Sequence, residues 1–280
     1  MFTGIQKISV YDPATGIVVQ FNNIAPEGEF QDGKFVDENA AGQMLYAGDD
    51  AAFEFMTMGE ESGLDQIKDW MDNETPVRLV AYGLEQHLLW YEDSFVHIRK
   101  GFDPAVGKRN RHTIRIVKKG LSNNITVGTN LLAMVNGWAD VNTDNLADNY
   151  EIVGAMVPAS FTGGVQRLTT AGVQSGLRFR AANLLIFPVA GAKLQLSVRV
   201  DTLTNGESLT ILAELLNYAS VALANESALL SAGVKSFTTP ANFYKVRLNL
   251  LNGDVSGALN ALLAYPYLGV QFGSHRDFTY

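Results

Sequence analysis

Apolar and polar residues alternate strictly over residues 193–201, and this alternation limits the fold more than any other feature of the chain. The residues from Leu194 to Val200 place every apolar side chain on one parity and every polar side chain on the other. Because successive side chains of a strand point to opposite faces, the pattern predicts a strand with one buried and one solvated face. The alternation resumes from Leu209 to Leu215, after Asn205 and Gly206, a pair typical of two-residue turns. We therefore expect a hairpin here.

Further strand signals make the fold class mainly β. In the second half they occur at residues 177–179, 244–250 and 264–272, spaced as in a two-sheet jelly-roll β-sandwich. In the first half, residues 5–11 and 16–21 predict a hairpin, and further strands are expected at 53–58, 77–82, 87–91, 95–98 and 113–117. One helix is expected at 62–73, with Ser62 as its N-cap. The Gly- and acid-rich residues 24–48 predict a long arm or loop.

The distribution of charge divides the chain. Residues 1–95 hold 18 Asp and Glu against 4 Lys and Arg, whereas residues 96–120 hold eight basic residues against Asp103 alone. Such segregation suits a subunit that stacks on copies of itself. With a short linker expected at 118–124, the sequence predicts two domains, residues 1–120 and 121–280. The chain has no cysteine, and neither a signal peptide nor a membrane span is expected, so assembly in a cytoplasm is the simplest expectation.

The order of elements in residues 1–120 resembles the tail-tube subunits of long-tailed bacteriophages. The matching features are an opening hairpin, a long arm, a strand at Phe53–Met58, a short helix, and strands that end in the basic segment Arg115–Lys119. The resemblance implies a sandwich or barrel with one helix, homohexameric rings that stack through the arm, contacts with other tail proteins, and DNA that passes through without specific binding. The protein would then be located in the tail of a virion.

The candidate self-assembly residues are acidic residues of the arm and basic residues from 99 to 111. The basic surface of one ring can meet the acidic arm of the next. A solvated loop is the alternative interpretation of the basic residues. The candidates are Glu27, Glu29, Asp32, Arg99, Lys100, Lys108, Arg109 and Arg111.

Residues 121–280 resemble carbohydrate-binding-module sandwiches of the kind appended to virion proteins. The similar segments are Asn130–Trp138, Leu194–Val200 and Phe237–Pro240. The resemblance implies an outward decoration domain whose partner is a host surface glycan. Trp138 and Tyr150 are the candidate sugar-stacking residues, although aromatic residues of a sandwich are more often part of its core.

One segment has the spacing of a calcium-binding loop. Its oxygen-bearing side chains at positions 1, 3, 5, 9 and 12 are Asp140, Asn142, Asp144, Asp148 and Glu151. The sixth position, Asn145, is not the usual glycine, but asparagine enters the left-handed region more readily than most residues. A polar loop is the alternative interpretation, and no other cofactor is expected.

No catalytic constellation is visible, and the four histidines lack metal-ligand spacing. An enzyme therefore has no positive support, and the resemblance of residues 1–120 implies a structural virion protein. The second hypothesis is a carbohydrate-binding or adhesion protein that uses the C-terminal sandwich, and an enzyme of unrecognised type is the third.

Overall fold

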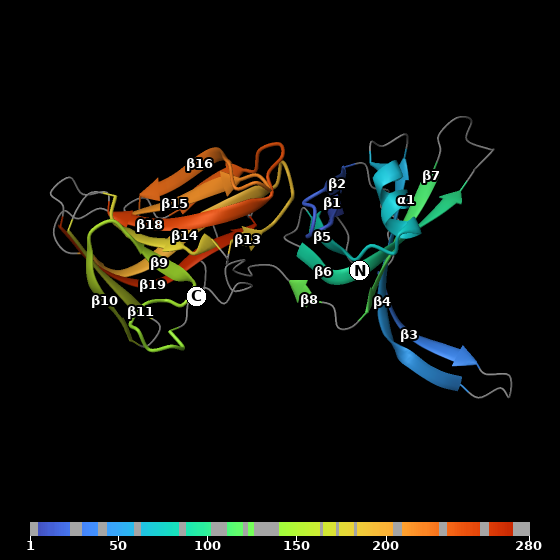
Figure 1. Ribbon diagram of the computed structural model, residues 1–280, viewed down its shortest axis with the longest axis horizontal. Helices are drawn as coiled ribbons and strands as arrows, with labels where there is room; N and C mark the ends of the chain where they lie inside the picture. Colours follow the sequence, from blue (N-terminus) through green and yellow to red (C-terminus); the bar gives the residue numbers. More distant parts are fainter. Residues whose placement is uncertain are drawn as a thin grey trace. The chain divides into compact units, whose positions relative to one another are not determined.

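A computed structural model describes residues 5–22, 30–38, 44–58, 63–83, 88–101, 111–119, 123–125, 140–162, 165–171, 174–181, 184–203, 209–229, 234–252 and 258–270 (Figure 1). The chain forms two compact units, residues 1–127 and 128–280. Both are built mainly from antiparallel strands, so the expected fold class is confirmed. Within the described ranges, no helix combines the length and apolar character needed to cross a membrane.

Unit 1, residues 1–127, contains a single eight-stranded sheet and the helix α1. Its elements are β1 (Ile5–Tyr11), β2 (Val18–Phe21), β3 (Phe30–Glu38), β4 (Met44–Met58), α1 (Leu64–Asp72), β5 (Val77–Gly83), β6 (Leu88–Gly101), β7 (Arg111–Lys119) and β8 (Asn123–Ile125). The order is β2-β1-β5-β6-β7-β4-β3, and β8 pairs with β6. Among the described strands the two ends of this order do not pair, so the sheet is open and no closed barrel forms.

The core of unit 1 joins strands from both ends of the sheet. Phe21 lies on β2, the first strand of the order, and Phe55 lies on β4, the last strand but one, yet their ring centroids are 5.2 Å apart. The sheet therefore curves around a common core, which α1 enters with Ile67 and Trp70. The buried cluster is Ile8, Val10, Val19, Phe21, Phe55, Ile67, Trp70, Val77, Leu79, Ala81, Val96, Ile114 and Ile116.

The expected helix is present, but its N-cap is different. Gly63, not Ser62, occupies the N-cap position and makes no side-chain capping bond. Its φ of 113° is strained for a residue with a side chain, and a Cβ there would lie 2.6 Å from Val19 Cγ1. Close packing of the helix start against β2 therefore requires a glycine at the N-cap. Ser62 itself lies outside the described residues.

The opening hairpin is confirmed, because β1 and β2 pair antiparallel from Ile8 opposite Phe21 to Tyr11 opposite Val18. Asp12 holds the turn: its carboxylate accepts hydrogen bonds from Ala14 N at 2.8 Å and Thr15 Oγ1 at 2.7 Å. The strands expected at 87–91 and 95–98 are instead one continuous strand, β6. Every residue from Ser94 to Gly101 has a partner in β7, and this pairing explains the continuity.

Of the arm or loop expected at residues 24–48, the described part is an arm built from two strands, so the loop alternative is wrong there. β3 and β4 form an antiparallel ribbon from Phe30 opposite Phe53 to Glu38 opposite Met44. β4 continues to Met58 and pairs with β7 from Asp50 onward. In the ribbon, β3 and β4 satisfy each other's backbone N–H and C=O groups. The free energy of these hydrogen bonds outweighs the weak strand propensity of the segment.

Unit 2, residues 128–280, is a sandwich of two antiparallel sheets (Figure 1). The six-stranded sheet has the order β16-β15-β18-β12-β9, with β13 also paired to β18; the five-stranded sheet has the order β10-β11-β19-β14-β17. The strands are β9 (Tyr150–Val153), β10 (Met156–Thr162), β11 (Val165–Ala171), β12 (Gly176–Phe179), β13 (Leu185–Ile186), β14 (Lys193–Leu203), β15 (Leu209–Leu216), β16 (Ala222–Leu229), β17 (Val234–Thr238), β18 (Lys245–Asn252) and β19 (Ala258–Val270).

The hairpin expected around Asn205 and Gly206 is wrong, although the alternation that suggested it marks the buried faces correctly. Leu194 and Leu196 of β14 are fully buried, and so are Ile211 and Leu215 of β15. The two strands nevertheless belong to different sheets. Because both sheets turn an apolar face toward the same core, alternation identifies that face without identifying the neighbouring strand.

The segment expected to be a linker is partly strand. Lys118 and Lys119 end β7, and the three residues of β8 pair with β6 from Leu88 opposite Ile125 to Trp90 opposite Asn123. Residues 123–125 therefore belong to the sheet of unit 1, and the compact unit ends at Val127.

Candidate functional site

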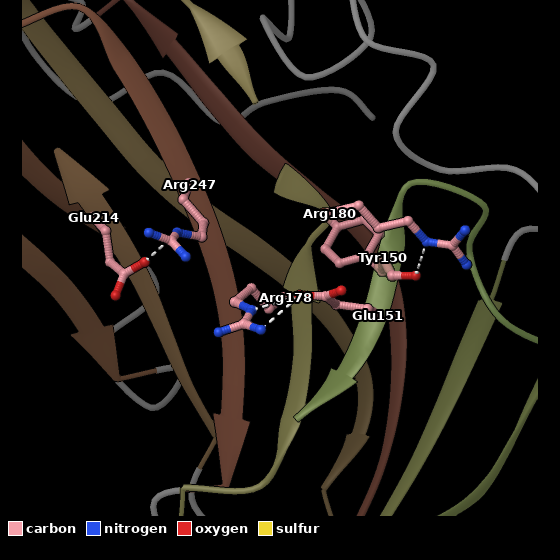
Figure 2. A network of polar contacts seen from close by, with 6 residues as sticks. All are labelled: Tyr150, Glu151, Arg178, Arg180, Glu214 and Arg247. Atoms are coloured by element: carbon pink, nitrogen blue, oxygen red, sulfur yellow. Dashed lines mark hydrogen bonds and ion pairs between the residues drawn. The ribbon is translucent and has the colours of Figure 1, made fainter. Parts of the chain in front are cut away.

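A row of polar side chains crosses the outer face of the six-stranded sheet. Strand register places Glu151 of β9 opposite Arg178 of β12, and Arg178 opposite Asn249 of β18. On the next row, Glu214 of β15 lies opposite Arg247 of β18. Their neighbours in β12, β15 and β18, such as Leu177 and Phe179 beside Arg178, are buried, and so is Tyr150 beside Glu151. Alternation therefore directs these five side chains, hereafter the polar row, away from the core. Figure 2 shows the four charged members.

Two ion pairs bridge the strands within the polar row. Arg178 Nη2 lies 2.6 Å from Glu151 Oε1, to which Arg178 Nε also donates a hydrogen bond at 2.8 Å. Arg247 Nε lies 2.7 Å from Glu214 Oε2. All four side chains are between 24% and 40% exposed. Ion pairs this accessible to solvent contribute about 0–1 kcal/mol to folding, so they orient groups more than they stabilise the sandwich.

Asn249 is the unusual member of the polar row. Its exposed fraction is only 4%, and its side-chain nitrogen Nδ2 has no hydrogen-bond partner within the part of the chain that the structure describes. Buried amide groups are normally hydrogen-bonded, because an unmade bond costs about 1–3 kcal/mol. The row thus combines two partly exposed guanidinium groups and two partly exposed carboxylates with a buried amide. Such a set can hydrogen-bond a ligand rich in hydroxyl groups.

The row was not identified from the sequence, because its members are separated by up to 98 positions, from Glu151 to Asn249. Two signals point toward it. Arg178 lies between the apolar residues Leu177 and Phe179, and Arg247 lies between Val246 and Leu248. Each pattern indicates a charged side chain on the outer face of a strand, but only strand order brings the two together.

Tyr150 is wrong as a sugar-stacking residue. Its side chain is fully buried, and its ring centroid lies 4.6 Å from that of Phe179. No face of the ring is accessible to a sugar, and burial raises the pKa of the phenol above its ordinary value. Arg180 Nε donates a hydrogen bond to the Tyr150 carbonyl oxygen at 2.9 Å (Figure 2). Trp138 lies outside the described residues.

An exposed aromatic side chain occurs instead at the turn between β15 and β16. Tyr218 is 43% exposed, and its ring meets the buried Tyr244 edge to face at 5.1 Å. Lys245 Nζ donates a hydrogen bond to the Tyr218 carbonyl oxygen at 2.8 Å and lies 5.9 Å from the ring centroid. Burial, and to a lesser extent the charge of Arg247, lowers the pKa of Lys245 from its ordinary value.

In the segment with calcium-loop spacing, the acidic side chains accept hydrogen bonds from nearby backbone groups. Asp140 accepts from the N–H groups of Asp144 and Asn145, and Asp148 accepts from Val141 N. Asn142 Oδ1 also accepts from Asp144 N, at 3.1 Å, and Asn142 Nδ2 donates to Asp144 Oδ2 at 3.0 Å.

The twelfth position of that segment, Glu151, is paired with Arg178 instead. Asn145 adopts a φ of 67°, the left-handed conformation expected for it. Among the described residues, no group of three or more acidic or histidine side chains is arranged to hold a metal ion. Calcium binding stays a prediction.

The self-assembly candidates lie partly outside the described residues: Glu27, Glu29, Lys108 and Arg109 are not described. Asp32 lies on β3 opposite Ala51. Arg99 and Lys100 lie near the end of β6, opposite Thr113 and His112, and Arg111 begins β7 opposite Gly101. The described candidates thus fall on the ribbon and on the paired ends of β6 and β7.

Comparison with known proteins gives only distant similarity. No family model matches the sequence, and no curated protein matches it. Among solved structures, the enzymatically active domain of tailspike protein 4 from bacteriophage CBA120 is similar over 49% of this chain and 22% of that chain, with 12% identity and a TM-score of 0.37. The accessory secretory proteins 1, 2 and 3 of Streptococcus pneumoniae are similar over 48% of this chain and 94% of that chain, with 13% identity and a TM-score of 0.34.

Carbohydrate-binding modules of the β-sandwich superfamily are also similar, over 86% of this chain and 96% of that chain, with 10% identity and a TM-score of 0.30. The structural neighbours thus include a phage tailspike domain and carbohydrate-binding modules, all at low identity.

Proposed function

We propose that this protein is a structural subunit of a phage tail tube. In this proposal unit 1 forms stacked hexameric rings that conduct DNA without binding it specifically, and unit 2 decorates the outside of the tail. The protein acts in the virion with other tail proteins, has no catalytic role and needs no cofactor. The observation that carries the proposal is the β3–β4 ribbon of unit 1.

The ribbon extends beyond the sheet to which it is attached. β7 pairs with β4 only from Asp50 to Met58, whereas β3 pairs with β4 as far as Met44. Residues 44–49 of β4 therefore have β3 as their sole described partner, and Figure 1 shows this ribbon reaching away from the rest of unit 1. Isolated two-stranded ribbons are at best marginally stable in water. A neighbouring copy that packs against the ribbon would supply the missing contacts.

The positions of opposite charges also favour contacts between copies. Asp32 lies opposite Ala51 on β4, and Arg111 lies opposite Met58 on the same strand. Seven residues of strand separate these positions, a distance of roughly 23 Å at about 3.3 Å per residue. Backbone positions this far apart within one subunit lie beyond the Debye length of roughly 8 Å at physiological salt. An attraction between Asp32 and Arg111 would therefore have to join different subunits, whereas Lys119 lies opposite Asp50 within one subunit.

Negative-stain electron microscopy of the purified full chain tests the proposal. We expect rings or tubes of stacked rings with six subunits in each ring. Dispersed particles at all salt concentrations between 20 mM and 500 mM would contradict it. The salt series matters because charge attraction between rings weakens as the Debye length shortens.

A second function, recognition of a glycan by unit 2, is supported by the polar row. Bidentate guanidinium groups and amides are the usual donors to sugar hydroxyls, and the ion pairs hold Arg178 and Arg247 in fixed orientations. The amide of Asn249 lies buried between these groups and is not offered to a ligand at the surface. In this proposal the glycan belongs to the host surface.

A glycan array, followed by calorimetry on each hit, tests this second function. The variants Arg178→Ala and Arg247→Ala should each weaken binding by about tenfold or more, because each removes a hydrogen bond worth about 1.5 kcal/mol. Ser236→Ala, on the exposed surface of β17 in the other sheet, is the matched control. Equal affinity of all three variants would exclude the polar row as the binding site.

A further inference from the structure

Positive charge is in excess on the outer face of the six-stranded sheet, although the whole chain carries a net charge of −8. The charged residues that face outward on its described strands are Glu151, Arg178, Glu214, Lys245 and Arg247. Glu226 of β16 faces the other way, because it lies opposite the buried Ala213. Arg180, one residue beyond β12, is exposed as well. This face therefore holds four basic residues against two acidic ones, a net charge of +2.

Lys245 and Arg247 are neighbours on this face, because they alternate with the buried Val246 and Leu248 along β18. Their Cα atoms are two residues apart in a strand, which is about 7 Å. Burial, and to a lesser extent the charge of Arg247, lowers the pKa of Lys245. Like charges this close repel each other, and an anion bound between them would offset the repulsion.

Both cations keep N–H groups that their contacts with described residues do not use. Lys245 Nζ donates to the Tyr218 carbonyl oxygen at 2.8 Å, which takes one of the three N–H groups of an ammonium. Arg247 approaches Glu214 through Nε, at 2.7 Å from Oε2, and this contact leaves the two Nη groups for another acceptor. The planar fork of a guanidinium matches the two oxygens of a carboxylate.

The acidic residues of the same face favour an acidic sugar over a nucleic acid. The contacts between described residues use one oxygen of Glu151, Oε1, and one oxygen of Glu214, Oε2. Each carboxylate therefore keeps an oxygen that can accept a hydrogen bond from a hydroxyl group. The backbone of DNA offers no hydroxyl groups along the chain, and its phosphates are repelled by carboxylates. A sugar that bears a carboxylate offers hydroxyl groups to the glutamates and an anion to the cations.

We propose that the glycan bound by unit 2 is acidic, and that a carboxylate of one of its sugar residues binds between Lys245 and Arg247. Hydroxyl groups of the same glycan bind the glutamates of this face. The proposal rests on the glycan-recognition function of the polar row, and it adds Lys245 to that site. It concerns unit 2 alone and does not depend on how unit 1 assembles.

Matched pairs of glycans test the proposal on the full chain. Each carboxylate-bearing glycan that binds on an array is compared by calorimetry with its methyl ester, which keeps the hydroxyl groups and loses the charge. Esterification should weaken binding at least about tenfold, because it removes charge-assisted hydrogen bonds to two cations. Equal affinity of acid and ester, or array hits confined to neutral or sulfated glycans, would overturn the proposal. A DNA duplex that binds as tightly as the acidic glycan would overturn it too.

Variants of Lys245 test the position of the anion. Lys245→Gln removes the charge and should lose at least about tenfold in affinity for the acid but little for the ester, whereas Lys245→Arg keeps the charge and should stay within about threefold of the parent. Lys193→Gln, at an exposed lysine of β14 in the other sheet, is the matched control for the loss of one positive charge. Equal losses at the two positions, or a loss that Lys245→Arg does not rescue, would refute the site.

The outcomes separate this inference from the function on which it rests. If no glycan binds, the glycan-recognition function fails, and the acidic ligand fails with it. If a neutral glycan binds and Arg178→Ala weakens its binding while Lys245→Gln does not, recognition by the polar row holds and the acidic ligand is refuted.

Discussion

At the scale of the residue, burial decides the role of Tyr150. The sequence shows a tyrosine near a polar loop, which is compatible both with a sugar platform and with the core. The structure places the ring in the core against Phe179, while Tyr218, at a turn, is exposed. Alternation within a strand of four residues is too short to separate these outcomes, because an edge strand can turn either face toward the core.

Truncation of Tyr150 therefore tests a structural role. We expect Tyr150→Ala to lower the free energy of unfolding by about 3–5 kcal/mol, the usual cost of removing a buried aromatic side chain. Tyr218→Ala, at an exposed position, should change it by only about 0.5 kcal/mol. Urea unfolding followed by tryptophan fluorescence measures both. Similar small effects for the two variants would place Tyr150 outside the core.

The same residue predicts a pH dependence. Burial raises the pKa of Tyr150 in the folded state above the unfolded value of about 10. Its contribution to stability is therefore fully present below pH 10. It is lost as pH rises above 10, because the unfolded chain releases the proton more readily than the folded one. Melting temperatures between pH 8 and pH 11 should fall less steeply for Tyr150→Phe than for the unmodified protein. Parallel curves would contradict this prediction.

At the scale of the element, sequence patterns located the strands more reliably than they predicted which strands are neighbours in a sheet. The periodicity of residues 193–201 and 209–215 marks the buried faces correctly, but the pair Asn205 and Gly206 does not join the two strands in one sheet. Strand pairing depends on contacts between distant segments, which local propensity does not contain. The polar row escaped prediction for the same reason, since Arg178 and Glu214 share a face only because β18 lies between their strands.

The ribbon supplies the test at this scale. Residues 34–49 can be replaced by Asn-Gly, a two-residue turn, because Gly33 lies opposite Asp50 in the native register. The β4 residues that pair with β7 from Asp50 to Met58 remain. We expect the shortened protein to stay folded, with a melting temperature within about 5 °C of the parent, since the deletion leaves the buried cluster intact. It should no longer form rings or tubes in negative stain.

Normal tubes from the shortened protein would show that the ribbon is not needed for assembly. A protein that neither folds nor assembles would instead assign the ribbon a role in the stability of unit 1. Circular dichroism separates these results before microscopy.

At the scale of the whole molecule, the boundary between the units follows strand pairing rather than charge. The change in charge near residue 120 suggested a linker there, yet β8 continues the sheet of unit 1 to Ile125. Charge composition reports on surfaces and solubility, not on which strands pair. A boundary at Val127 keeps every described strand of each sheet within one unit.

Two truncations test this boundary. A fragment of residues 1–127 retains β8 and should fold and still form rings. A fragment of residues 1–119 lacks β8, which exposes the edge of β6 at Leu88–Trp90, so it should melt at a lower temperature. Differential scanning calorimetry compares the two fragments at equal concentration. Identical melting temperatures would mean that β8 adds nothing to unit 1.

The position of β19 in the five-stranded sheet sets the order in which the units can be completed during synthesis. β19 lies between β11 and β14, so the hairpin of β10 and β11 cannot join β14 and β17 until residues 258–270 have left the ribosome. Unit 1 has all its described strands once residue 125 has emerged. While the ribosome adds the remaining strands, a finished unit 1 is tethered to an incomplete sandwich whose apolar strand faces are still uncovered. In the proposed tail tube, partner subunits would therefore meet unit 1 on the nascent chain before unit 2 has folded.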